Sequence, residues 1–186
     1  MKAVIAWAVC VLLIGLIAVG TFRAVSSVAS SKKRQMRQEG TQKMASGDYA
    51  GAIEDFDAAL EKSGKRSKGF NSDVLMYRAE AEYKLRDYEA SIHTYDLLLE
   101  MEPSTASYLY AQSMCYSQMG DTENAVATYQ AGAALEKDAK ASAGKMEALV
   151  AAGGAYVDAK EYEKAMGFYQ DALKEGMKHG QIYNQM

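Results

Sequence analysis

The sequence predicts an all-α protein in which one membrane-spanning helix precedes a stack of helix–turn–helix units. Three observations support this prediction. A ten-residue pattern that begins as "GDYAGAIEDF" (47–56) occurs four times along the chain. The composition favours helix, because Ala, Glu, Lys and Leu are abundant and the 186 residues include a single Pro. No charged residue occurs between Lys2 and Arg23.

The N-terminal apolar run is long enough to cross a bilayer. It covers 3–22, and 20 helical residues at about 1.5 Å each match a hydrocarbon core of roughly 30 Å. We therefore predict a single-pass membrane anchor over 1–23. The alternative is a cleaved signal peptide, since 27–29 ("SVA") offers small residues for cleavage. The apolar region of such a peptide usually has about 7–15 residues, which favours the anchor.

Basic residues are concentrated after the apolar run, in a juxtamembrane linker (24–32) and the segment that follows. Residues 23–45 hold six Lys or Arg and one Glu, which gives +5, whereas 46–186 holds 14 basic and 23 acidic residues, which gives −9. The positive-inside rule favours a cytoplasmic location for the part after the anchor, and an extracytoplasmic location stays open. The Met-Lys start with one short anchor indicates a bacterial protein. Five cations are either solvated or attracted to anionic lipid at the membrane surface: Arg23, Lys32, Lys33, Arg34 and Arg37.

The repeated pattern aligns in four copies on pairs of small residues. The second helix of each copy carries one of Ala52, Ser91, Ala125 and Ala165, and an aromatic residue follows four positions later: Phe56, Tyr95, Tyr129 and Tyr169. The first helix carries a small residue twelve positions earlier: Gly40, Ala79, Ser113 and Gly153. Spacings of three and four indicate helices, and Gly47-Asp48 and Gly120-Asp121 mark turns. Small residues let the paired helices pack closely, with the aromatic ring filling the space beside them.

These four copies resemble the tetratricopeptide repeat, a unit of 34 residues. The stretch "AGGAYVDAKEYEKAMGFYQDAL" (152–173) carries the resemblance most clearly. It implies a right-handed superhelical solenoid of four repeats, at about 33–66, 72–105, 106–139 and 146–179. The last residues, 180–186, are either a tail or the start of an incomplete fifth repeat.

The family resemblance implies a protein-binding groove lined by the first helices of successive repeats. The implied groove residues are Met76, Glu80, Tyr83, Lys84, Tyr110, Met114, Ser117, Gln118, Val150, Val157 and Asp158. We therefore predict a membrane-tethered scaffold that binds a peptide or helix of another protein. Self-association into a homo-oligomer, or a role as the accessory region of a longer protein, are the alternatives.

No pattern in the sequence predicts catalysis, a metal site or a cofactor. His93 and His179 lie in different repeats without partners at metal-ligand spacing, and Cys115 has no neighbouring His to activate it. The acidic charge of 46–186 disfavours nucleic acid as a partner. We expect a non-enzymatic protein whose partners are another protein and the membrane.

Overall fold

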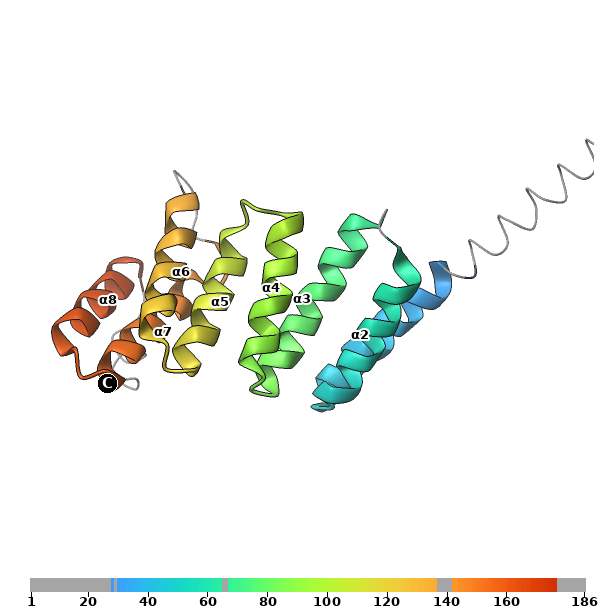
Figure 1. Cartoon of the computed structure of the whole chain (residues 1–186), viewed down its shortest axis with the longest axis horizontal. Helices are drawn as coiled ribbons and strands as arrows, with labels where there is room; N and C mark the ends of the chain where they lie inside the picture. Colours follow the sequence, from blue (N-terminus) through green and yellow to red (C-terminus); the bar gives the residue numbers. More distant parts are fainter. Residues whose placement is uncertain (1–27, 29, 65–66, 137–141, 177–186) are drawn as a thin grey trace, which may run out of the picture. The chain divides into compact units, whose positions relative to one another are not determined.

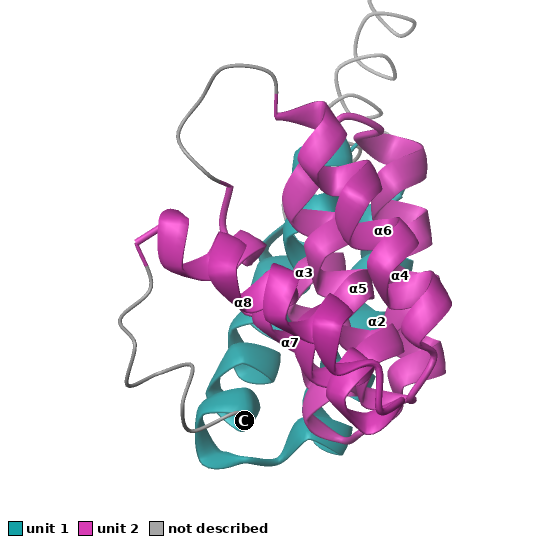
Figure 2. Ribbon diagram, turned by 90° about the vertical axis from the view of Figure 1, so that its left-hand side faces the viewer, with its two compact units in different colours: residues 1–74 teal, residues 75–186 magenta. Residues whose placement is uncertain are grey.

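The computed structural model describes residues 28, 30–64, 67–136 and 142–176, and these residues form helices joined by short turns (Figure 1). After a first helix over 30–46 come α2 (Tyr49–Ser63), α3 (Lys68–Lys84), α4 (Tyr88–Met101), α5 (Ala106–Gln118), α6 (Thr122–Leu135), α7 (Lys145–Asp158) and α8 (Tyr162–Lys174). The prediction of an all-α helical-repeat fold is thereby confirmed. The chain divides into two compact units, residues 1–74 and 75–186, and α3 contributes residues to both (Figure 2).

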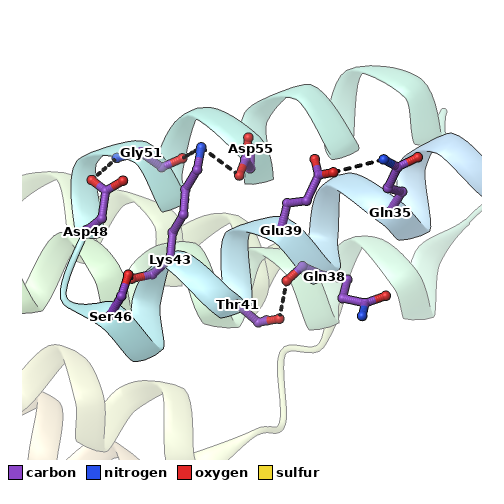
Figure 3. Close-up of polar contacts among 9 residues, drawn as sticks. All are labelled: Gln35, Gln38, Glu39, Thr41, Lys43, Ser46, Asp48, Gly51 and Asp55. Carbon is purple, nitrogen blue, oxygen red and sulfur yellow. Dashed lines mark hydrogen bonds and ion pairs between the residues drawn. The ribbon is translucent and has the colours of Figure 1, made fainter.

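In the first unit, the first helix and α2 pack where the small residue of the repeat lies. Gly40 is buried, and a Cβ atom there would lie 2.6 Å from the ring of Phe56 on α2. Figure 3 shows Lys43 reaching from the first helix towards α2, where its ammonium lies 2.9 Å from Asp55 Oδ2 and donates to the Gly51 carbonyl. Gly40 therefore allows the first helix and α2 to approach closely, and the ion pair between Lys43 and Asp55 links the two helices.

In the second unit, successive helices pack on one another along the chain. Helix α5 contacts α4, α6 and α7, and α7 also contacts α6 and α8. The core combines many alanines with a few leucines and large rings, and Tyr110 and Tyr169 are its largest fully buried side chains. At Gly153 on α7, an added Cβ would lie 2.8 Å from the Tyr169 ring. The predicted pairing of small residue and aromatic ring is confirmed at this repeat as at the first.

A twelve-residue register relates the two helices of each pair. Ser91 Oγ donates to the Ala79 carbonyl at 2.9 Å, and Ser113 Oγ donates to the Ala125 carbonyl at 2.7 Å. Both hydroxyls are buried, so these bonds satisfy polar groups at the closest helix contact. The small residues of the repeat therefore serve two purposes, since they admit the neighbouring backbone and they hydrogen-bond to it.

The four turns within the helix pairs share one construction. One or two positions after each first helix comes a residue with positive φ, which is Gly47 (83°), Arg86 (64°), Gly120 (75°) or Lys160 (60°). In each turn the amide of the next residue, an Asp or Glu, donates to a carbonyl five positions back in the first helix. At three turns that residue is an Asp whose carboxylate caps the second helix. The predicted turns at 47–48 and 120–121 are confirmed, and two equivalent turns form without glycine.

The start of the second repeat differs from the prediction. The second repeat was predicted to begin at about residue 72, yet α3 already begins at Lys68. Its first turn is held by Asn71 N–H donating to the Ser67 carbonyl at 2.9 Å, and the Lys33 ammonium lies 4.5 Å from the Phe70 ring centroid. A local backbone bond and one contact from the first helix thus accompany the earlier start of α3.

Candidate functional site

One open cavity gathers residues from three helices of the second unit. Its volume is about 220 Å³. Its lining comprises Glu80, Tyr83 and Lys84 of α3, Tyr95 of α4, and Ala111 and Met114 of α5. Four of these six are sequence-predicted groove residues: Glu80, Tyr83, Lys84 and Met114.

Helical spacing explains why these side chains meet. Glu80, Tyr83 and Lys84 follow one another at three and four positions, so they share one face of α3. Ala111 and Met114 are three positions apart and share a face of α5 in the same way. The α5 helix packs on α4, which supplies Tyr95. The cavity is therefore the place where two first helices of the repeat flank a second helix.

Two rings inside the cavity are fixed by other rings. The Tyr83 ring meets the Tyr88 ring edge-on, with 5.5 Å between centroids, and the Tyr95 ring lies 6.2 Å from that of Tyr108. Tyr108 in turn donates a hydrogen bond to Glu102 Oε2 at 3.1 Å. These contacts limit the freedom of both cavity rings, which lowers the entropy that a ligand would have to remove.

The electrostatics of the cavity suit an apolar ligand with charges at its edge. Burial raises the pKa of Tyr83 and of Tyr95 above the usual value for tyrosine, because a low-dielectric surrounding disfavours the phenolate. Burial and the hydrogen bond to Glu102 raise the pKa of Tyr108 to about 12. Glu80 and Lys84 are exposed and place opposite charges one helical turn apart at the rim.

Tyr110 is a correction to the predicted groove. Its side chain is fully buried, and its ring lies 5.7 Å from that of Tyr129. Gly132 on α6 makes the space for it, since a Cβ there would lie 2.8 Å from Tyr110 Cε1. A tyrosine on the predicted groove helix is therefore a core residue, because a glycine faces it.

The other predicted groove residues lie outside the cavity lining. Met76 is 43% exposed, and its sulfur lies 3.7 Å from the Tyr108 hydroxyl oxygen. Val150 and Val157 pack against the core cluster around Leu149. Three polar residues complete the predicted set. The Ser117 hydroxyl donates a hydrogen bond to the Ser113 carbonyl of its own helix. Gln118 lies near the Tyr88 hydroxyl, and Asp158 is exposed.

Two residues of the lining were not among the predicted groove residues. Ala111 could have been found from its spacing, because it lies three positions before Met114 on the same helix. Tyr95 was assigned only to packing between the paired helices. Nothing local in the sequence distinguishes it from Tyr129 or Tyr169, and its place in the lining depends on how α5 packs beside it.

The predicted membrane-surface cations differ in what they contact. Arg37 forms a two-pronged ion pair with Asp73, at 2.7 and 3.0 Å, and Lys33 donates to two serine hydroxyls. Lys32 and Arg34 are exposed. Arg23 and the predicted anchor over 1–23 lie outside the described residues. Within the described ranges, no helix is both long enough and apolar enough to cross a bilayer.

The described part of the chain contains no group of three or more His, Cys, Asp or Glu side chains placed to hold a metal ion. Cys115 is fully buried, and burial raises the pKa of its thiol to about 11. Such a thiol carries little thiolate at neutral pH and is a poor nucleophile.

The fold and the cavity define a class of helical-repeat proteins, and comparison with known sequences gives the family. The tetratricopeptide repeat family model matches residues 37–106, 78–139 and 110–179, which together span most of the chain. The chain therefore belongs to the tetratricopeptide repeat family. No curated protein sequence matches it significantly.

Solved structures with low sequence identity share the fold. MamA (residues 41 to the end) from Desulfovibrio magneticus RS-1 aligns with a TM-score of 0.62 and 15% identity, over 77% of this chain and 75% of that one. YrrB, described as a TPR protein with an unusual peptide-binding site, gives 0.65 and 17%, over 91% and 85%. A tetratricopeptide repeat protein from Parabacteroides merdae ATCC 43184 gives 0.65 and 17%, over 83% and 57%.

Proposed function

We propose that the chain is a membrane-tethered scaffold that binds a peptide or helix of another protein at the cavity between α3, α4 and α5. The observation that carries this proposal is the cavity itself, which brings together Tyr83 and Met114 with the charged pair Glu80 and Lys84. Aromatic and thioether groups are common at recognition surfaces, because they bury a large area and adapt in shape. The peptide-binding site described for YrrB, which shares the fold, supports the same class of function.

The size of the cavity favours a single protruding side chain as its occupant. At about 220 Å³ it is smaller than the roughly 300–1,000 Å³ of sites that enclose a drug-sized molecule. A bulky apolar side chain would fill it, while Glu80 and Lys84 would pair with charges that flank this side chain in the partner. The partner is therefore a peptide or helix with one apolar anchor between charged neighbours.

The tether is the second part of the proposal and rests on the uncharged run over 3–22. A helix of this length would confine the repeats near one bilayer and raise the effective concentration of a membrane-associated partner. The basic residues that follow favour the cytoplasmic side. This part can be tested by extraction of membranes at high pH, which leaves a spanning helix in the membrane.

Self-association is a second candidate, because α8 leaves large apolar side chains in solvent. Tyr162 is 63% exposed and Met166 is 45% exposed. A second copy could cover them, and sedimentation of the full chain in detergent over a range of concentrations would detect it. Binding through α8 and binding through the cavity use different residues, so one set of variants separates them.

The test places a photoactivatable crosslinking residue at Ala111 and compares two matched variants. The double variant Tyr83→Ala, Met114→Ala removes two large side chains from the cavity lining. The double variant Tyr162→Ala, Met166→Ala removes the same residue types from α8. We expect the cavity variant to weaken capture of the partner about 30-fold, as for loss of a binding hot spot of about 2 kcal/mol, and the α8 variant to retain it. Equal capture by both would refute the cavity as the site. Capture of other copies of the chain, lost in the α8 variant, would favour self-association.

A further inference from the structure

A single lysine ties two separate basic segments together in the first unit. The Lys33 ammonium donates to Ser63 Oγ at 3.2 Å and to Ser67 Oγ at 2.8 Å. It also lies 4.5 Å from the centroid of the Phe70 ring. The start of the first helix is therefore held against the end of α2 and the start of α3.

This contact gathers cations that are thirty or more positions apart in the sequence. Lys32 and Arg34 flank Lys33, Lys62 adjoins Ser63, and Lys68 adjoins Ser67. These four residues are exposed, and with Lys33 they form what we call the basic pole: Lys32, Lys33, Arg34, Lys62 and Lys68.

Few carboxylates neutralise the basic pole among the contacts of the described residues. Glu61 lies 3.4 Å from Lys62, and its side chain is 74% exposed, so this pair is weak. Asp73 is engaged with Arg37, which lies outside the pole. The Arg34 guanidinium donates to the Ser30 hydroxyl, which is a neutral partner. The pole is therefore a concentrated positive surface on a unit that belongs to an acidic chain.

We propose that the basic pole binds the anionic phospholipid headgroups of the membrane that holds the chain. The inference rests on the proposed tether, because the uncharged run ends at Phe22, ten positions before Lys32. Ten residues span at most about 35 Å, so the tether keeps the pole close to the bilayer surface. Attraction between Lys or Arg and anionic lipid acts within about 8 Å at physiological salt, a distance that the linker permits. Contact through the pole orients the first unit with this end towards the bilayer.

Lipid is favoured over nucleic acid by the charge of the rest of the chain. The 46–186 segment carries 23 acidic against 14 basic residues, and an extended polyanion would be repelled where it runs beyond the pole. A bilayer surface next to the anchor would contact the basic pole and not the acidic remainder of the chain. The chemistry required of the partner is a layer of phosphate-bearing headgroups with net negative charge.

The test uses the full chain reconstituted into vesicles of phosphatidylcholine, or of phosphatidylcholine mixed with phosphatidylglycerol. Amide hydrogen exchange is measured in peptides that cover 30–36 and 60–64. We expect these peptides to exchange more slowly in the mixed vesicles, and the difference to disappear at high salt. Lys32→Glu with Lys68→Glu should weaken this protection about 30-fold, the effect of removing two contacts of ordinary strength.

Lys164→Glu with Lys174→Glu is the matched control. Both lysines are on α8, with side chains 59% and 75% exposed, and the change in net charge is the same. The proposal would be overturned if the control variant reduced the protection as much as the pole variant does. It would also be overturned if the protection were equal in both kinds of vesicle. The same protection by a DNA duplex without vesicles would also overturn it, in favour of a general polyanion site.

Flotation of the same samples separates the pole from the tether. If the chain floats with neutral vesicles at high salt but shows no lipid-dependent protection, the proposed tether is supported and lipid binding by the basic pole is refuted. If the chain floats only with the mixed vesicles, is released from them by salt and shows the protection, the tether is refuted and lipid binding by the basic pole is supported.

Discussion

At the scale of single residues, glycines decide how closely the helices of the second unit approach. A Cβ at Gly153 would lie 2.8 Å from the ring of Tyr169, which is itself buried. Gly167 on α8 also lies inside a helix, but nothing lies within 4 Å of the Cβ position there. Identical residues in the helices of one pair thus have different physical roles.

This contrast predicts opposite effects for one substitution. Gly153→Ala should lower the free energy of unfolding by about 1–3 kcal/mol, because the Tyr169 ring has to move within a packed core. Gly167→Ala should raise it by up to about 1 kcal/mol, because alanine favours helix and meets no neighbour. Thermal unfolding followed by circular dichroism measures both. Equal changes in the two midpoints would show that Gly153 does not set the helix separation.

At the scale of elements, the repeated turn has the same backbone with and without glycine. Arg86 and Lys160 adopt positive φ where the equivalent turns have Gly47 and Gly120. The amide of the following residue makes the same bond in each turn, so the backbone geometry persists although the side chain opposes it. A residue with a Cβ pays roughly 1–2 kcal/mol for this conformation.

Lys160→Gly should therefore stabilise the chain by about 1 kcal/mol, since it removes that strain at an exposed position. Gly120→Ala should destabilise it by a similar amount, because it introduces the strain where φ is 75°. Urea unfolding of the two variants beside the parent chain provides the comparison. A Lys160→Gly variant less stable than the parent would mean that contacts of the lysine outweigh its backbone strain.

At the scale of the whole molecule, the thiol of Cys115 reports how the second unit opens. It lies on α5, which contacts α4, α6 and α7, and its side chain is fully buried beside the Ser91 hydroxyl at 3.5 Å. Burial raises its pKa from 9.0 to about 11. Because the folded state holds this proton more tightly, the associated stability is complete below pH 9 and is lost as the pH rises towards 11.

We predict that Cys115 reacts with a thiol reagent only after the second unit opens, in a chain that carries Cys10→Ser. Its rate at neutral pH should rise with urea in parallel with unfolding. The comparison is Ala111→Cys in a chain with both native cysteines replaced by serine, since position 111 lines the cavity and should react without opening. Similar rates for the two thiols in the absence of urea would contradict the burial of Cys115.

The candidate site shows which of its residues the sequence can predict and which it cannot. The resemblance to the tetratricopeptide repeat predicted Glu80, Tyr83 and Lys84 as groove residues, and their three- and four-residue spacing, a local property of a helix, places them on one face of α3. The same reasoning failed for Tyr110, whose exposure depends on Gly132 of another helix. It also could not add Tyr95, which enters the lining from the second helix of its pair.

From the sequence the helical repeats, the pairing of their helices and the family could be predicted, because the repeated small and aromatic residues encode local periodicity and close packing in every copy. Tertiary structure alone decided which side chains remain open to a ligand and which charges come together. Tyr110 is buried by a glycine that faces it, and Lys33 brings two basic segments to one end of the first unit. Both outcomes depend on contacts between residues far apart in the chain, and local spacing does not specify these.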